Sequence, residues 1–350
     1  MKNSLVSSFV FLLIAFSSNA QTLISGIVYD TSYAPIPYAS IYLSKTTVGV
    51  MADDKGAYAI TVPQDGKYVL IASRIGFKSQ SQIIKADGTN KVTNIKLSVQ
   101  PVLIQEVTIK DKDRNHRKNY ELFLKCFIGE TPNAPFCTIE NPKDLIVYLE
   151  SSGRNLIAYS VKPLIITNSS FGYKIIYDLK SFSYDISKEH LRFSGDYYFK
   201  DISNQKSANS RYKRNRLIAY YGSRMHFLRA LFTGSVSQEQ FEMCNIELDS
   251  CGTKILTNSL HEDDLRFAIQ SDSMTIYHFY PVLIHYTDNH PELFPLPYIY
   301  DQKNYTSRII FTDTLHVYNN GYYPESYNVS WGGNMSGDRI AEMLPFDFVP

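Results

Sequence analysis

Between residues 23 and 110, apolar and polar positions alternate in short segments. An alternation with a period of two indicates strands, whose side chains point in turn to two faces of a sheet. The segments are 23–30, 37–44, 56–63, 67–76, 90–99 and 103–110, and turn-forming Gly, Pro and Asp residues separate them. So many short strands predict a β-sandwich. The rows expected to supply its core are Tyr58, Ile60 and Val62 on one strand and Val69 and Ile71 on the next.

Three segments of residues 111–350 have helical signals. In the first, from Asp113 to Gly129, apolar residues recur with helical spacing, and Asp113 can cap the start. The second lies between Ser223, a cap, and Gly234, a stop signal. A third is expected to begin at Ser237, because Gln240 would complete a capping box with it.

The rest of this second region is rich in β-branched and aromatic residues, which favour strands. Extended segments are expected at 144–150, 155–161, 163–170, 172–185, 191–202, 273–287 and 307–323. Asn320-Gly321 in the last of these is a strong hairpin signal. The predicted fold class is therefore mainly β, with a sandwich at 21–110 followed by a β-rich α+β domain with two or three helices at 111–350.

Residues 1–20 have the pattern of a signal peptide. Lys2 precedes an apolar run from Leu5 to Phe16, and Ser18 and Ala20 suit a small-residue cleavage site. An uncleaved anchor is the alternative, but a bilayer span needs roughly 20 apolar residues. We therefore expect an exported protein that begins at Gln21, and no later stretch predicts a transmembrane helix.

The charge balance argues against a nucleic-acid partner. The chain has 35 Lys and Arg residues and 34 Asp and Glu residues, so no global field would attract nucleic acid. Two local basic runs, 113–118 and 211–216, could bind phosphates or lipid head groups. Solvated ends of helices or strands explain such runs more often, and we favour that interpretation.

Four cysteines lie in two close pairs, Cys126 with Cys137 and Cys244 with Cys251. In an oxidising compartment these could be disulfides, although four cysteines allow three connectivities and the sequence does not choose among them. Neither pair has the C-x-x-C spacing of a zinc or redox site.

An acidic stretch at 53–56 is the first candidate for a metal site. Asp53, Asp54 and Gly56 could supply oxygen ligands, but a calcium loop needs ligands spread over about a dozen residues, and that spacing is missing. Aspartate also bonds to its own backbone and glycine accepts a positive φ, as tight turns require. We therefore expect the tip of a hairpin.

No catalytic motif stands out. The H-x-x-E and H-E-x-x-H zinc patterns, the G-x-S-x-G elbow and the phosphate-binding glycine loops do not occur. His278, His285 and His290 are interpreted as ordinary strand and turn residues rather than metal ligands. The polar cluster 261–264 is interpreted as solvated charge with capping, and Trp331-Gly332-Gly333 as a turn with an aromatic anchor. We predict no catalytic, metal-binding or cofactor-binding residues and no cofactor.

The front segments carry a family resemblance. "SGIVYDTSYAPIPYASIYL", "GVMADDKGAYAITV", "YVLIASRIGFKSQSQII" and "IKLSVQPVLIQEVTIK" resemble the carboxypeptidase regulatory-like domain. The resemblance implies a transthyretin-like or Ig-like β-sandwich, itself non-catalytic, that is common in envelope proteins of Gram-negative bacteria. It also implies a location in the periplasm or at the outer membrane or cell surface. Residues 111–350 resemble uncharacterised envelope proteins that carry the same module, and they imply no site residues.

Two functional hypotheses follow. The leading one is a non-catalytic envelope protein whose sandwich binds carbohydrate or an envelope protein partner. The 27 tyrosines agree with it, because an exposed ring can stack on a sugar or anchor a partner, although most will pack within sheets. The alternative is a secreted hydrolase with an unrecognised site in 111–350. The sequence leaves the identity of the ligand unknown.

Overall fold

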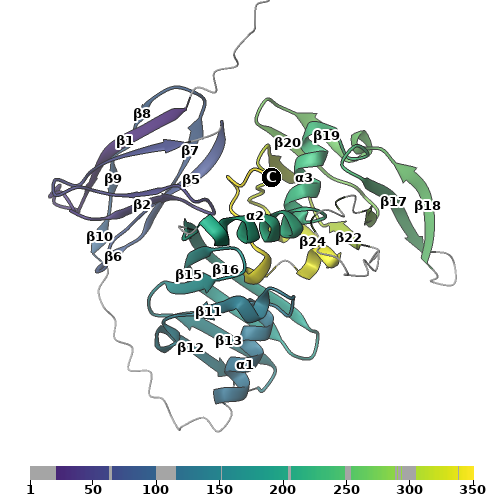
Figure 1. The fold of residues 1–350 in the computed structure, drawn as a ribbon, viewed down its shortest axis with the longest axis horizontal. Coiled ribbons are helices and arrows are strands. Elements are labelled where there is room, and N and C mark those ends of the chain that lie inside the picture. Colours follow the sequence, from purple (N-terminus) through teal and green to yellow (C-terminus); the bar gives the residue numbers. More distant parts are fainter. Residues whose placement is uncertain are drawn as a thin grey trace, which may run out of the picture.

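The computed structural model describes residues 21–62, 65–99, 116–150, 152–203, 206–248, 254–287, 290, 293, 305–337 and 339–350. The predicted signal peptide and the segment 103–110 lie outside these residues. The fold is mainly β, as predicted, and has three parts that surround the C-terminal residues (Figure 1). Each part has its own cluster of buried apolar side chains.

The front part is the predicted sandwich. One sheet has the order β4-β1-β8 with β9 also paired to β1, and the other has the order β3-β2-β5-β7. Two short strands, β6 and β10, pair with each other at one end. The bounds are Thr22–Tyr29 (β1), Ser40–Leu43 (β2), Gly49–Met51 (β3), Ala57–Val62 (β4), Gly66–Ser73 (β5), Phe77–Lys78 (β6), Gln80–Ala86 (β7), Lys91–Val92 (β8), Ile95–Lys96 (β9) and Ser98–Val99 (β10).

One of the two predicted core rows is confirmed. Tyr58, Ile60 and Val62 are all buried in the sandwich core. On β5 the prediction is wrong, because the core cluster contains Tyr68, Leu70 and Ala72 instead of the alternate row with Val69 and Ile71. Both faces of this central strand are apolar, so alternation does not identify the inner face.

The acidic stretch is a turn, but it does not join a hairpin. The backbone N–H groups of Lys55 and Ala57 donate to Asp53 Oδ1 at 2.9 and 2.8 Å, and Gly56 has a φ of +72°. However, β3 pairs with β2 whereas β4 pairs with β1, so the turn passes from one sheet to the other. Asp53 thus satisfies the backbone of its own turn.

The middle part is a six-stranded antiparallel sheet covered by helix α1. The order is β11-β14-β15-β13-β12, and β16 also pairs with β15. Phe123 and Phe127 on α1 pack into its core. The bounds are His116–Phe127 (α1), Cys137–Ile139 (β11), Leu145–Leu149 (β12), Asn155–Ser160 (β13), Leu164–Asn168 (β14), Tyr173–Asp185 (β15) and His190–Asp201 (β16). Strand β11 was not predicted, and the other bounds match the predicted segments closely.

The third part has a five-stranded sheet, β18-β17-β21-β22-β24, and a three-stranded sheet, β19-β20-β23. Helix α2 precedes it, and α3 contributes Phe227, Leu228 and Leu231 to its core. The bounds are Lys206–Tyr220 (α2), Arg224–Thr233 (α3), Phe241–Leu248 (β17), Lys254–Leu260 (β18), Arg266–Ile269 (β19), Ser273–Ile276 (β20), Val282–Tyr286 (β21), Tyr305–Phe311 (β22), Leu315–Tyr318 (β23) and Val329–Gly333 (β24).

The helix predictions have mixed outcomes. The caps of α3 are confirmed, because the Ser223 side chain accepts from the His226 N–H and Gly234 is left-handed with a φ of +70°. The helix predicted from Ser237 is wrong. Residues 236–240 form turns, and Gln240 has a φ of +63°, which ends the helical path before β17. Asn320-Gly321 also forms a turn without a hairpin, since β23 pairs with β20.

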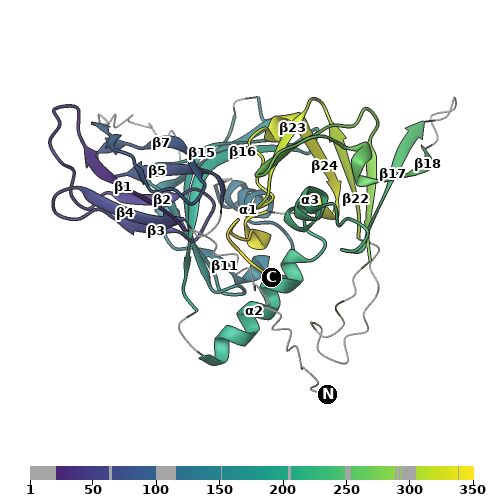
Figure 2. The same ribbon diagram turned by 90° about the horizontal axis from the view of Figure 1, so that it is seen from above.

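The C-terminal residues connect all three parts (Figures 1 and 2). The Ala341 N–H donates to the Ile128 carbonyl in the middle part, and the Phe346 N–H donates to the Lys45 carbonyl in the sandwich. From the third part, the Arg229 guanidinium donates to the carbonyls of Phe346 and Phe348 at 3.0 and 2.9 Å. We call residues 340–348 the C-terminal strap.

Candidate ligand-binding groove on the sandwich

A groove of about 440 Å³ runs along one edge of the sandwich. Almost all of its lining side chains carry a hydroxyl, an amide or an ammonium group. They are Thr31, Gln80, Ser81, Gln82, Asn94, Ile95, Lys96 and Ser98. Hydroxyl and amide groups at a surface groove can exchange hydrogen bonds with the hydroxyl groups of a carbohydrate.

The strand period explains why these polar groups face outward. Ile95 and Leu97 are buried in the sandwich core, so Asn94, Lys96 and Ser98 between and beside them are exposed. On the other side of the groove, β7 is the last strand of its sheet. Most of the polar groove residues lie on strands, which favours a fixed arrangement of donors and acceptors.

An exposed tyrosine borders the groove. Tyr33 is 72% exposed, and its ring stacks on that of Tyr29 with centroids 5.2 Å apart. The ammonium group of Lys96, a groove residue, lies 4.9 Å from the Tyr33 ring centroid. The exposed part of the Tyr33 ring can therefore offer an apolar surface next to polar groups, which is the combination that sugar rings require.

The loop that carries Tyr33 is held by Asp30. The backbone N–H groups of Ser32 and Ala34 donate to Asp30 Oδ1 at 2.8 and 3.0 Å. The Ser32 hydroxyl also donates to this oxygen, and this bond is the main reason why the pKa of Asp30 is lowered. Tyr33 has a φ of +66°, which is uncommon for a residue other than glycine, so the turn imposes a specific orientation on it.

The other residues singled out in the sequence do not form a shared site. His278 contacts Tyr280, and His285 Nδ1 lies 3.4 Å from Thr306 Oγ1. His290 stacks on Tyr221 with a ring distance of 3.7 Å. Within the described part of the chain, no group of three His, Cys, Asp or Glu residues could hold a metal ion.

The cluster 261–264 is a cap, as interpreted from the sequence, but its charges are not all solvated, because Glu262 is buried. The His261 N–H donates to Asp264 Oδ2 at 2.7 Å, and the Asp263 N–H donates to His261 Nδ1 at 3.4 Å, so a short 3-10 helix begins there. Trp331 lies on β24 and donates from Nε1 to the Tyr323 hydroxyl at 3.2 Å. It is an aromatic anchor within a strand, not within a turn.

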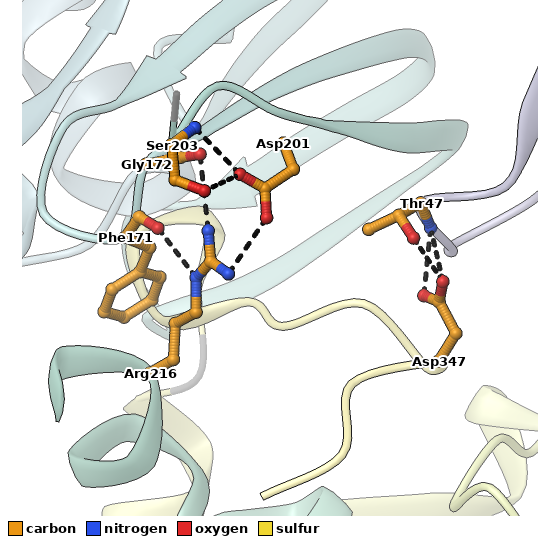
Figure 3. Close-up of polar contacts among 7 residues, drawn as sticks. All are labelled: Thr47, Phe171, Gly172, Asp201, Ser203, Arg216 and Asp347. Atoms are coloured by element: carbon orange, nitrogen blue, oxygen red, sulfur yellow. Dashed lines mark hydrogen bonds and ion pairs between the residues drawn. The ribbon is translucent and has the colours of Figure 1, made fainter. Parts of the chain in front are cut away.

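The second basic run belongs to helix α2, which the sequence interpretation missed. Arg216 is buried there and donates to the Phe171 carbonyl at 2.8 Å and to Asp201 Oδ2 at 3.0 Å (Figure 3). Its guanidinium carbon also lies 3.8 Å from the Tyr173 ring centroid. This arginine links α2 to the middle sheet, so it is not a solvated phosphate ligand. Of the first run, 113–115 lie outside the described residues.

The possible disulfide between Cys126 and Cys137 is not formed. Cys126, Cys137 and Cys244 are free thiols, and Cys251 lies outside the described residues. Burial raises the pKa of Cys137 to about 12, so this thiol is a poor nucleophile near neutral pH.

Sequence reasoning also missed a buried histidine. His226 on α3 accepts from the Gly222 N–H at 3.1 Å through Nδ1, and its Nε2 lies 3.0 Å from Glu239 Oε2. Desolvation is the main cause that lowers its pKa. Its place three residues after the capping Ser223 is the only local signal of a structural role.

The comparisons with known proteins bear mainly on the sandwich. Residues 24–109 match the family model of the CarboxypepD_reg-like domain. The front of this chain is a CarboxypepD_reg-like domain. This confirms the predicted family of the sandwich. A search of the curated proteins gave no match.

Solved structures give partial likenesses. One is a chain of a type II cohesin–X-dockerin complex from Acetivibrio cellulolyticus, 17% identical, with a TM-score of 0.20, covering 22% of this chain and 58% of that chain. Another is catechol 1,2-dioxygenase from Acinetobacter sp. ADP1, 9% identical, TM-score 0.20, covering 25% and 55%. A third is the minor pilin GBS52 from Streptococcus agalactiae, 14% identical, TM-score 0.21, covering 23% and 46%. The matches span about half of each of these chains.

In the described residues, the structure has no helix that is both long enough and apolar enough to cross a bilayer.

Proposed function

We propose that this chain is an exported, non-catalytic protein that binds carbohydrate through the edge groove of its CarboxypepD_reg-like domain. The observation that carries the proposal is the lining of the groove, where hydroxyl and amide groups lie beside the Lys96 ammonium group, which contacts the exposed Tyr33 ring. The polar groups would exchange hydrogen bonds with sugar hydroxyls, and the ring would cover an apolar sugar face.

A protein partner is the second candidate. Strand β7 ends its sheet, and Ile83 on it is 73% exposed. An edge strand offers unpaired backbone groups to which an extended peptide can add. This mode of binding would depend on the β7 backbone and on Ile83 rather than on Tyr33.

A glycan array with the full chain, followed by calorimetry on the strongest binder, tests the proposal. We expect Tyr33→Ala to weaken binding about fivefold, because a lost ring contact is worth about 1 kcal/mol. Tyr38→Ala is the matched control. Tyr38 is also exposed and has a φ of +57°, but its ring lies near Arg74 and does not border the groove.

Equal affinities for the two variants, or no glycan bound, would count against the proposal. Binding of a partner protein that is lost in the Ile83→Asp variant but retained in the Tyr33→Ala variant would favour the second candidate, a protein partner at the β7 edge. Cleavage of a bound oligosaccharide would instead support the hydrolase hypothesis for residues 111–350.

A further inference from the structure

A second cavity, of about 310 Å³, lies where the three parts meet. The sandwich contributes Lys45, the middle part contributes β16 and the end of α2, and the C-terminal strap closes one side. The aromatic lining residues are Tyr177, Phe193, Tyr197, Tyr322, Tyr323 and Phe346. A cavity of this size, mainly apolar with a few charged groups, has the usual character of a small-molecule site.

Lys45 is fixed in this junction by its backbone. Its N–H donates to the Tyr197 carbonyl at 2.6 Å, and its carbonyl accepts from the Phe346 N–H at 2.9 Å. Its φ of +67° is unusual for lysine. The following residues strengthen this arrangement, because the Thr46 carbonyl accepts from the Phe199 N–H at 2.8 Å and the Thr47 N–H donates to Asp347 (Figure 3).

The ammonium group of Lys45 has an aromatic contact but no counter-charge. Its Nζ lies 4.4 Å from the centroid of the Tyr322 ring. Within the described residues, no carboxylate forms an ion pair with it and no acceptor forms a hydrogen bond with it. Among the described residues that line the cavity, Glu342 is the only carboxylate, and its two oxygens accept hydrogen bonds from Asn133 Nδ2 at 2.9 and 3.0 Å.

The lysine is nevertheless mostly charged at neutral pH. Desolvation lowers its pKa to about 8, and the more distant Asp196 opposes this shift. At pH 7 the cavity therefore presents a cation that is only partly compensated. Arg224 also lines the cavity. The charged or titratable side chains around Lys45 include Lys67 and Tyr68 on the sandwich side. The others are Asp196, Tyr177, Tyr197, Arg224, Tyr322, Tyr323 and Glu342.

We infer that the junction cavity binds an organic carboxylate with a flat ring, whose carboxylate pairs with the Lys45 ammonium and whose ring packs between the aromatic side chains. A ligand anion would supply the missing counter-charge. The ring would bury apolar surface against Tyr322 and Phe346, which contact each other with centroids 5.5 Å apart. This site is separate from the sandwich groove, so either can exist without the other.

The test is a thermal-shift screen of the full chain against aromatic and heteroaromatic carboxylates, each beside its neutral amide. We expect at least one carboxylate to raise Tm and its amide to have little effect. Calorimetry on that carboxylate should show at least a tenfold loss of affinity in Lys45→Gln, and near wild-type affinity in Lys45→Arg. Lys96→Gln is the matched control, because Lys96 also lies over a tyrosine ring but outside the cavity.

The pH profile adds a readout that a purely structural role would not change. If the bound anion needs the charged lysine, affinity should fall about tenfold per pH unit above pH 8 in the wild type. In Lys45→Arg it should stay level, because arginine remains charged. Amides that bind as well as carboxylates, a carboxylate that binds Lys45→Gln equally, or a panel without any stabilising member would overturn the inference.

Discussion

The sandwich groove and the junction cavity are built in opposite ways. All residues that line the groove come from one domain, and most of them are exposed polar groups on neighbouring strands. The lining residues of the cavity are far apart in the sequence, from Lys45 near the front to Phe346 near the end. The shape of the cavity therefore depends on the loop that carries Lys45, on strand β16, on helices α2 and α3 and on the C-terminal strap. A ligand of the groove meets a preformed surface, whereas a ligand of the cavity also reports whether the three parts are docked.

The largest expected effect comes from the arginine that holds the strap. Arg229 donates to the carbonyls of Asn320, Phe346 and Phe348. Arg229→Met would leave these acceptors without their charged donor, so we expect a loss of about 3 kcal/mol in the free energy of unfolding. Denaturant unfolding measures this change. Arg211→Met, at an exposed position of α2, is the control.

The same variant separates the two sites. Carboxylate binding in the cavity should be lost in Arg229→Met. Glycan binding by the groove should remain within about twofold of the wild type, since no backbone hydrogen bond between described residues joins the groove to the strap. Loss of both carboxylate and glycan binding would show that the groove also depends on the docked arrangement of the three parts. The groove would then not be a preformed surface of one domain.

A smaller effect concerns pH and the ligand-free protein. The folded state lowers the pKa of Lys45 from 10.5 to about 8, so the unfolded state binds more protons between these values. The contribution of Lys45 to the free energy of unfolding therefore rises between pH 8 and pH 10.5 and is lowest below pH 8. Relative to Lys45→Met, the wild type should gain about 2 kcal/mol between pH 7 and pH 10.

Urea unfolding of the wild type and of Lys45→Met at several pH values gives the difference between their free energies of unfolding. The titration of all other groups contributes equally to both proteins and cancels in this difference. A constant difference would mean that Lys45 is solvated at the junction, contrary to the structure.

The smallest effect is expected at the acidic turn. Asp53→Ala removes two hydrogen bonds to the backbone of its own turn, which should cost the sandwich about 1 kcal/mol. Because this turn does not contact the other parts in any described bond, affinities at both sites should stay unchanged. A Tm measurement checks the stability, and calorimetry checks the affinities at both sites. A changed affinity for the carboxylate in the cavity would contradict the prediction.

Much of the fold could be predicted because local signals agree with the long-range packing. The alternation at Tyr58, Ile60 and Val62 and the caps at Ser223 and Gly234 are examples. Predictions were wrong where the same local sequence pattern was compatible with two structures. The apolar faces of β5 looked alike, and Ser237-Gln240 suited a cap as well as a turn before β17. Helix α2 was missed because its buried Arg216 is compensated by Asp201 on another element.

The two sites differ in the same respect. The alternation of Asn94, Lys96 and Ser98 with buried neighbours is visible in the sequence, although their proximity to Gln80 and Gln82 is not. Nothing around Lys45 distinguishes it from other lysines, because its environment comes from Tyr197, Tyr322 and Phe346, which are distant in the chain. The acidic stretch resembles a metal site in composition, yet the Asp53 side chain accepts hydrogen bonds from the backbone of its own turn.

Amide hydrogen exchange at single-residue resolution tests the docked junction most directly. The Lys45 N–H is bonded to the Tyr197 carbonyl, whereas the Lys55 N–H is bonded only to the exposed Asp53 side chain of its own turn. We predict that the Lys45, Phe199 and Phe346 amides exchange at least a hundredfold more slowly than the Lys55 amide, on the order of 3 kcal/mol of protection. Exchange of the Lys45 amide as fast as that of Lys55 would contradict the account.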